Sequence, residues 1–244
     1  MVVVLKLGGS VITEKDRPET LDGDSLAALA DAIAAAGTEG LVVVHGGGSF
    51  GHHHAADYGV STTEGTHDIE ALMAIHGAMK TLNQFVLSRL HERDVPALPV
   101  HPLSAAARDG NADLTLMTEQ VATMLEEGFV PVLHGDGVAH AGEGVTVVSG
   151  DELVTELATA LDADRVGLCS TVPGVLDGDD KVIPVIDDFE AVADLLGVSD
   201  ATDVTGGMGA KVRELLGLGS PAYVFGPDAV DGFLAGDDVG TRIE

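Results

Sequence analysis

The sequence carries little positive charge. Twelve lysine and arginine residues face forty aspartate and glutamate residues, which gives a formal net charge of −28 over 244 residues. Because nucleic acid is bound by basic surfaces, we expect no nucleic-acid partner. The mean hydropathy is nevertheless positive, at +0.26, unlike the apolar-poor composition of disordered chains. This acidic composition resembles that of proteins from organisms that keep molar salt in the cytoplasm, where charges are screened from one another over a few ångströms.

Cysteine and long apolar runs are also scarce. The single cysteine, Cys169, excludes an internal disulfide and a cysteine metal cluster, and its apolar neighbours predict a buried thiol. No stretch reaches the roughly 18 to 20 consecutive apolar residues of a membrane span, and the N-terminus lacks the pattern of a secretory signal. We therefore expect a soluble cytoplasmic protein with no membrane partner.

Short apolar runs alternate with amphipathic segments along the chain. The runs predict buried strands at residues 2–7, 41–44, 97–100, 129–133, 164–169 and 222–225. The amphipathic segments predict helices at residues 24–36, 67–93, 117–127, 151–162, 187–196 and 208–218. This alternation predicts an α/β fold, in which an open, mostly parallel sheet is sandwiched by helices.

Two short segments break the alternation. Residues 145–148 predict a short strand, and residues 172–186 predict a β-hairpin with its tip at residues 177–180. We expect such hairpins near the ligand cleft. Because no linker or repeat interrupts the chain, we expect a single domain over residues 1–244, with an acceptor-binding lobe at about 1–164 and a nucleotide-binding lobe at about 165–244.

Glycine clusters follow several of the predicted strands. They read "KLGGS" at 6–10, "HGGGSFGH" at 45–52 and "GDGV" at 135–138, each predicted at a strand-to-helix junction, and "DVTGGMGAK" at 203–211 is predicted to open a helix. In open α/β sheets, anions bind at the carboxyl ends of strands through backbone N–H groups. Of only five lysines, three lie in or beside these clusters, so the pattern indicates a site for several phosphates.

Two other interpretations of the glycine and histidine stretch stay open. Gly46, Gly48 and Gly51 satisfy G-x-G-x-x-G, a dinucleotide-binding pattern, although we expect no helix to run on directly from these glycines. The four histidines at positions 45 and 52–54 suggest a metal site instead. Three consecutive histidines do not share one face of a helix or strand, so at most one or two of them could converge on an ion.

Five motifs together resemble a known group of enzymes. "KLGGSVIT" with Lys15 just beyond, "HGGGSFGH", "VSGDEL", "TGGMGAKV" and "GTRIE" occur in the order and spacing of the amino acid kinase superfamily, over essentially the whole chain. Within it, the histidine that closes "GSFGH" makes the chain similar to the isopentenyl phosphate and fosfomycin kinases. The overall pattern most resembles the isopentenyl phosphate kinases.

This resemblance implies the amino acid kinase-like fold and an ATP-dependent phosphotransferase. The implied reaction converts isopentenyl phosphate to isopentenyl diphosphate, for isoprenoid biosynthesis by an alternative mevalonate route. It implies ATP and Mg²⁺ as cofactors, with the Mg²⁺ carried by ATP and no metal site in the protein, and a homodimer. The alternatives are a kinase of this fold for another phosphate or phosphonate, such as fosfomycin, and a non-catalytic protein that binds nucleotide or metal.

The resemblance also implies roles for residues near the N-terminus. Lys6, Gly8, Gly9 and Ser10 would meet the β and γ phosphates of ATP. Lys15 would stabilise the phosphoryl group during transfer. Such roles agree with the chemistry, because phosphoryl transfer depends on positioning and on stabilisation of charge.

The acceptor side is implied in the same way. The amides of Gly47 and Gly48 would hold the acceptor phosphate and the ATP phosphate respectively, and His52 would donate a hydrogen bond to the phosphate of isopentenyl phosphate. Gly150 would lie against the acceptor, while Asp151 would orient the lysines. No strong general base is needed, because the acceptor is already an anion.

The opposite lobe would contribute the rest of the ATP site. Gly207 and Lys211 would bind ATP, and Thr171 would line its site at a position where family members commonly carry an aspartate. The implied catalytic set is Lys6, Lys15, His52, Asp151 and Lys211.

The hydrocarbon tail of the acceptor needs an apolar pocket. Candidates for its walls are Leu72, Ile75 and Met79 on the long predicted helix, together with Val132. The alternative is that these side chains belong to the core or to a dimer contact, because an apolar stripe is expected of any packed helix.

Overall fold

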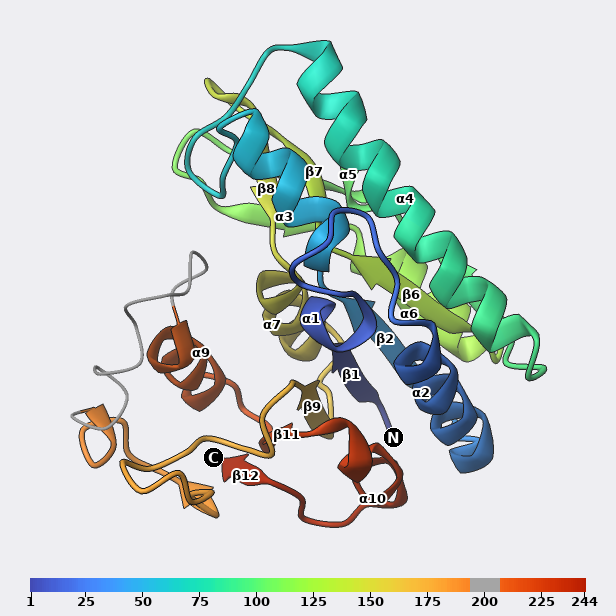
Figure 1. The fold of residues 1–244 in the computed structure, drawn as a ribbon, viewed down its shortest axis with the longest axis vertical. Coiled ribbons are helices and arrows are strands. Elements are labelled where there is room, and N and C mark those ends of the chain that lie inside the picture. The colour runs from blue at the N-terminus through green and yellow to red at the C-terminus, as the bar shows by residue number, and fades with distance from the viewer. Residues whose placement is uncertain (194–206) are drawn as a thin grey trace.

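An eight-stranded sheet runs through the middle of the molecule (Figure 1), with strand order β10-β12-β11-β9-β1-β2-β6-β3. The structure is a computed structural model that describes residues 1–193 and 207–244. Neighbouring strands of this sheet are parallel except β11 and β12, which are antiparallel. The predicted open, mostly parallel sheet is therefore confirmed.

The strands of this sheet are short and mostly apolar. Their bounds are β1 Val3–Leu7, β2 Leu41–His45, β3 Ala97–Pro99, β6 Val130–His134, β9 Arg165–Cys169, β10 Val185–Ile186, β11 Ala222–Phe225 and β12 Thr241–Ile243. Each predicted apolar run overlaps one of these strands, although β2 and β6 each continue one residue beyond the predicted run. Strand β12 is not predicted from the sequence, because its three residues are too few for a periodic signal.

Helices cover both faces of the sheet, because successive side chains of a strand point to opposite faces. Val3, Leu5 and Leu7 of β1 share a core with α2, α4 and α10, while Val4 shares the second core with α6, α7 and α9. The helices are α1 Gly9–Ile12, α2 Gly23–Ala36, α3 Gly48–Asp57, α4 Ile69–His91, α5 Pro102–Ala105, α6 Thr118–Glu126, α7 Gly150–Ala160, α9 Gly207–Leu216 and α10 Val230–Ala235, with a 3₁₀ turn η2 Pro227–Ala229.

A second, four-stranded sheet corrects one prediction. Its strand order is β5-β4-β7-β8, with β4 Ala106–Arg108, β5 Leu114–Leu116, β7 Asp136–His140 and β8 Gly144–Val148. The sequence predicts β8, but it assigns "GDGV" to a strand-to-helix junction, whereas β7 begins within this cluster, at Asp136. Strand β7 is stabilised by its antiparallel pairing with β8. Its own sequence is too weakly apolar to predict a strand.

Helix α3 corrects a second prediction. It begins at Gly48, so a helix does run on directly from the glycines, contrary to the expectation from "HHHAADYG". The segment has little apolar periodicity, since Phe50 is its one large buried side chain. Phe50 packs edge-on against Phe85 of α4, with ring centroids 6.4 Å apart. Packing on α4, rather than amphipathic pattern, therefore stabilises this helix.

The predicted hairpin is present as a tight turn. Leu176 and Val182 form an isolated antiparallel bridge, and the Asp177 carboxylate accepts hydrogen bonds from the backbone N–H groups of Asp179 and Lys181 at the tip. The predicted helix at 187–196 is not formed over residues 187–192, whereas residue 193 is helical. Residues 194–196 lie outside the described part. The division into two lobes near residue 165 stays a prediction.

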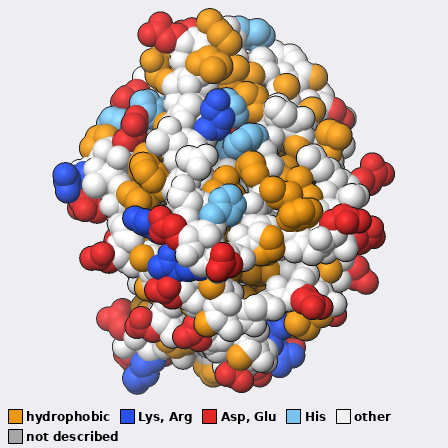
Figure 2. Space-filling model, turned by 90° about the vertical axis from the view of Figure 1, so that its right-hand side faces the viewer, with side chains coloured by type: hydrophobic (Ala, Val, Ile, Leu, Met, Phe, Trp, Pro, Cys, Tyr) orange, Lys and Arg blue, Asp and Glu red, His pale blue; other side chains and the backbone are white. Residues whose placement is uncertain are grey.

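The surface on the side of α4 carries apolar side chains among acidic ones (Figure 2). Ile69, Met73 and Phe85 of α4 are 67%, 50% and 42% exposed. No helix within the described ranges is long and apolar enough to cross a membrane. The homodimer inferred from the resemblance stays a prediction.

Gly167 lies in a closely packed part of the core, whereas Gly77 borders open space. A Cβ added to Gly167 of β9 would lie 2.5 Å from the ring of the buried Phe233 of α10, whereas one added to Gly77 of α4 would meet nothing within 4 Å. We expect Gly167→Ala to lower the free energy of unfolding by about 1 to 3 kcal/mol through overpacking. Gly77→Ala should raise it by up to about 1 kcal/mol through helix propensity. Urea unfolding in high salt measures both, and changes of the same sign would contradict this account.

Candidate active site

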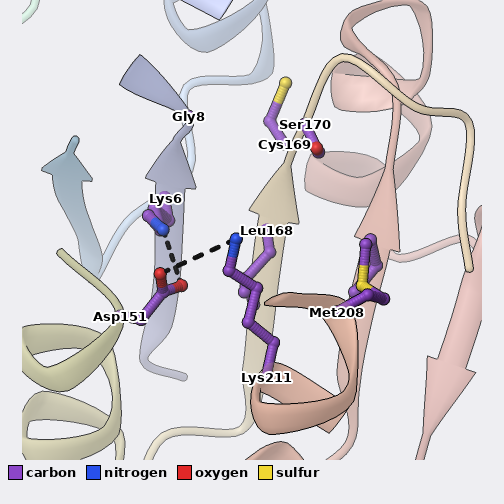
Figure 3. A pocket seen from close by; sticks show the side chains of 9 residues that line it. Lys6, Gly8, Asp151, Leu168, Cys169, Ser170, Met208 and Lys211 are labelled. Atoms are coloured by element: carbon purple, nitrogen blue, oxygen red, sulfur yellow. Dashed lines mark hydrogen bonds and ion pairs between the residues drawn. The ribbon is translucent and has the colours of Figure 1, made fainter. Parts of the chain in front are cut away.

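Two lysines meet one aspartate at the carboxyl edge of the main sheet. Lys6 of β1 places Nζ 2.6 Å from Oδ1 of Asp151, and Lys211 of α9 places Nζ 4.0 Å from Oδ2 of the same carboxylate (Figure 3). Gly8, Cys169, Ser170 and Met208 are among the residues that line the small cavity around them. The structure thus brings together three of the five predicted catalytic residues, although they come from distant parts of the sequence.

Burial and charge act against each other in this cluster. Burial lowers the pKa of Lys6, while the Asp151 carboxylate opposes that change. Burial by itself raises the pKa of Asp151, but Lys6 and Lys211 together hold it below its usual value. Glu214 of α9 also interacts with both lysines and with Asp151, so the carboxylates offset much of the charge of the two ammonium groups. The two lysines are nevertheless the groups at this cavity that can pair with an anionic ligand.

The N-terminus of α7 holds Asp151 in place. Ser149 and Glu152 form a capping box, in which each side chain bonds to the other residue's backbone N–H. Glu152 also accepts a 2.5 Å hydrogen bond from Arg108 of β4, whose side chain is 5% exposed. The small sheet is thereby joined to the helix that carries Asp151. Arg108 is not predicted from the sequence, because nothing in its spacing from Glu152 signals the contact. The capping box itself can be predicted from "SGDE".

The two N-terminal glycine loops lie in direct backbone contact. A Cβ on Gly9 would lie 2.2 Å from the backbone nitrogen of Gly48, so no side chain fits there. Thr13 joins the loops: its hydroxyl donates to the Gly9 carbonyl at 2.8 Å and accepts from the Ser49 N–H at 3.0 Å. Thr13 is a second missed residue, although it lies within the quoted motif "KLGGSVIT".

The amides predicted to bind phosphate lie at the N-terminus of α3. Gly47 is the N-cap and Gly48 the first residue of this helix, with Gly48 at φ +49°. Gly150, the first residue of α7, lies against this loop, since a Cβ there would be 3.2 Å from Lys6 Cε and 3.7 Å from Gly46 Cα. Helix N-termini present free N–H groups to anions. Two such ends and Lys6 therefore surround one position.

Other predicted ATP-site residues lie at the rim or outside the cavity. Ser10 and Lys15 are exposed, and Lys15 lies on the loop after α1, away from the cavity lining. Thr171 is exposed, while the preceding Ser170 lines the cavity. Gly207 begins α9, the helix that supplies Lys211; the rest of its glycine cluster, residues 203–206, lies outside the described residues.

Cys169 has the buried thiol that the sequence predicts. It is 1% exposed at the end of β9. Burial raises the pKa of this thiol to about 12, so it stays protonated and unreactive at neutral pH.

The histidines of "HGGGSFGHHH" occupy different environments. His45 is buried at the end of β2, whereas His52 and His53 are exposed on α3. His54 contacts Glu19 at 2.5 Å and so joins α3 to the loop that carries Lys15. Within residues 1–193 and 207–244, no group of three or more histidine, cysteine or acidic side chains is arranged to hold a metal ion.

The predicted tail-pocket residues do not form one group. Met79 and Val132 are buried in the core that includes α2 and α4, and the Met79 sulfur lies beneath Gly47 and Gly51. Ile75 is 3% exposed yet belongs to neither core cluster. Leu72 is half-buried and lies close to Gly137 of β7. Leu72 is therefore placed between α4 and the small sheet, and the role of all four stays a prediction.

The carboxylate of Asp151 should determine the protonation of Lys6. We expect Asp151→Asn to lower the pKa of Lys6 further, because the variant removes the anion that opposes the effect of burial. Heteronuclear NMR titration can follow each of the five lysines. The matched control is Asp179→Asn, since Asp179 pairs with Lys181 at 3.5 Å on the exposed hairpin tip. Titration of Lys6 at the same pH in both variants would refute the coupling.

The chain is similar to known kinases over nearly its whole length. Residues 1–218 match the model of the amino acid kinase family. An isopentenyl phosphate kinase of Haloferax volcanii is 63% identical over 243 residues, covering 99% of this chain and 98% of the relative. One of Methanothermobacter thermautotrophicus is 36% identical, covering 99% and 98%.

Solved structures agree with the fold. A crystal structure of isopentenyl phosphate kinase superposes with a TM-score of 0.82 at 29% identity, covering 100% of both chains. An aspartate kinase of Synechocystis, 20% identical, shares the fold with a TM-score of 0.71 over 100% of this chain and 39% of its own. The chain therefore belongs to the amino acid kinase family, and within it to the isopentenyl phosphate kinases.

Proposed function

We propose that this protein transfers the γ-phosphoryl group of ATP to isopentenyl phosphate, which yields isopentenyl diphosphate and ADP. The observation that carries this proposal is the 63% identity to an isopentenyl phosphate kinase over 99% of the chain. The use of ATP follows from the kinase family. The two lysines of the cavity between β1, α7 and α9 support the proposal, because both substrates are phosphate anions.

Positioning and charge account for most of the catalysis in this scheme. Lys6 and Lys211 neutralise charge on the phosphoryl group during transfer, and Asp151 holds both ammonium groups at one place. The backbone contact of Gly9 with Gly48 brings the two phosphate loops together. Such proximity holds donor and acceptor phosphates in line without covalent participation of the protein.

The acceptor binds beside α3 in this proposal. The Gly47 N–H and the His52 imidazole hold its phosphate, with Gly150 against the other side. A histidine beside a phosphate is at least partly protonated, so it acts as a hydrogen-bond donor rather than as a base. Lys15 reaches the phosphoryl group from the loop that the contact of His54 with Glu19 joins to α3.

The side chains of the cavity indicate how the proposed Mg²⁺ is bound. Divalent magnesium prefers oxygen ligands, but the carboxylate of Asp151 is paired with two lysines. This arrangement fits an ion carried by the phosphates of ATP better than one held by protein side chains. A cytoplasmic location and a homodimer stay predictions.

Purified protein tests the reaction directly. We expect ADP formation in high salt with ATP, Mg²⁺ and isopentenyl phosphate, and much less with fosfomycin or acetylglutamate in its place. Phosphorus NMR distinguishes the diphosphate product from background hydrolysis of ATP. If isopentenyl phosphate were not turned over, the proposed function would be wrong, whichever other acceptor reacted.

The three consecutive histidines should differ in their effect on turnover. We expect His52→Ala to lower kcat/KM for isopentenyl phosphate by about a hundredfold, since it removes a donor to the reacting phosphate. His53→Ala should leave the rate within about twofold, because His53 is exposed and makes a 3.5 Å surface contact with Asp57 and an edge-on ring contact with His54. His54→Ala should have a small effect through Glu19. Equal losses at the three positions would contradict the role of His52.

A further inference from the structure

Two buried histidines end neighbouring strands beneath the proposed phosphate site. His45 ends β2 and His134 ends β6, and the two residues are register partners. Both are 0% exposed, and their rings stack with centroids 5.4 Å apart at 26°. Each is followed by a glycine. The proposed reaction assigns neither imidazole a role, although burying a polar ring requires hydrogen-bond partners.

The same hydrogen-bond pattern occurs at both strand ends. The Gly46 N–H donates to the Leu7 carbonyl at 3.0 Å, and the Gly46 carbonyl accepts from Nδ1 of His45 at 3.1 Å. The Gly135 N–H donates to the His45 carbonyl at 3.1 Å, and the Gly135 carbonyl accepts from Nδ1 of His134 at 2.9 Å. Each glycine therefore has both of its backbone polar groups held by the sheet.

These contacts determine the tautomer of both rings. A carbonyl oxygen can only accept, so Nδ1 of His45 and of His134 must carry the proton. Burial lowers the pKa of His45 to about 4 and that of His134 well below its usual value. Both imidazoles are therefore neutral, and their Nε2 atoms are acceptors. Nε2 of His134 receives a hydrogen bond from Nδ1 of His101 at 2.8 Å.

Asn83 of α4 supplies the matching donor for His45. Its Oδ1 lies 3.2 Å from His45 Nε2, which would place two acceptors together. Its Nδ2 is buried without a hydrogen-bond partner among the described residues. Rotating the amide by 180° pairs Nδ2 with Nε2 and moves Oδ1 to the place where Nδ2 lay, since the oxygen and nitrogen of an amide have nearly the same shape. Nδ2 of Asn83 then donates to Nε2 and keeps His45 in the Nδ1–H tautomer.

The bond from His45 has a consequence for the phosphate loop. Because a trans peptide unit is planar, the Gly46 carbonyl and the Gly47 N–H point in opposite directions. Gly47 is the N-cap of α3, so its N–H has no acceptor within the helix. A peptide between two glycines can rotate with little steric cost. Holding the Gly46 carbonyl at the imidazole therefore fixes the direction of the Gly47 N–H.

We propose that His45 is a positioning residue for the reaction: its Nδ1–H holds the Gly46–Gly47 peptide so that the Gly47 N–H faces the acceptor phosphate. Asn83 fixes the tautomer that makes this bond. His134 makes the same bond to Gly135, where the chain turns from β6 into β7. The inference rests on the proposed function, in that it takes the phosphate at Gly47 to be that of the acceptor.

A pair of substitutions separates this role from packing. In His45→Asn the amide nitrogen lies one bond beyond Cγ, as Nδ1 does, so the donor to Gly46 is kept. In His45→Gln the donor lies one bond further out and is lost. We expect His45→Gln to raise KM for isopentenyl phosphate by roughly tenfold, with KM for ATP within about twofold, while His45→Asn stays near the wild type. Leu82→Ala, which leaves a cavity in the core under α4, controls for general loss of packing.

Two measurements do not depend on turnover. Long-range ¹H–¹⁵N NMR of the folded wild-type protein reports imidazole tautomers, and we expect Nδ1–H at His45 and His134. Inorganic phosphate, titrated against the Gly47 amide resonance, should bind roughly tenfold more weakly to His45→Gln than to His45→Asn.

The outcomes separate the two proposals. Equal effects of the asparagine and glutamine variants would overturn the positioning role. An Nε2–H tautomer at His45 would also overturn it, and this measurement on the wild type stands even if one variant fails to fold. Parallel rises of both KM values in His45→Gln and Leu82→Ala would also overturn it, since they would indicate general packing. Phosphate binding that depends on His45, without turnover of isopentenyl phosphate, would keep the positioning role and reject the proposed acceptor.

Discussion

The pairing of Asp151 with Lys6 and Lys211 is the interaction on which the site depends. It joins β1, α7 and α9, which belong to three separate parts of the chain. Lys6 is 9% exposed, and a buried ammonium group without a partner would carry a large desolvation penalty. Asp151 is itself held by the capping box of α7 and, through Glu152, by Arg108 of the small sheet. The charge that attracts phosphate is thus tied to both sheets.

The acidic composition of the chain affects how phosphate anions reach the two lysines. A formal net charge of −28 repels anions at long range at low ionic strength. In molar salt the screening length falls to about 3 Å, so that a phosphate reaching the cavity responds mainly to the adjacent lysines and backbone N–H groups. The functional cations can therefore be few, provided that burial and ion pairing hold them close together. Hydrogen bonds to backbone groups, as at Gly46 and Gly135, add orientation without adding charge.

Much of the fold could be predicted because its strands are buried on both faces. Continuous apolar runs gave β1, β2, β6, β9 and β11 directly. Helix α3 and strand β7 could not be predicted, because their sequences are rich in glycine and histidine and their stability comes from α4 and β8. The glycine motifs indicated where phosphate would bind, but Thr13 and Arg108 act through partners 36 and 44 residues away in sequence.

By itself, the sequence determined the α/β class, the carboxyl edge as the place of the site and the residue types that bind phosphate. These follow from local periodicity and from the small side chains that close backbone approach demands. Tertiary structure alone decided that Lys6 and Lys211 share one carboxylate, and that His45 is a neutral donor beneath the loop while His52 is exposed. The physical reason is that burial and hydrogen-bond partners set the charge and tautomer of a side chain, and both arise from contacts between distant segments.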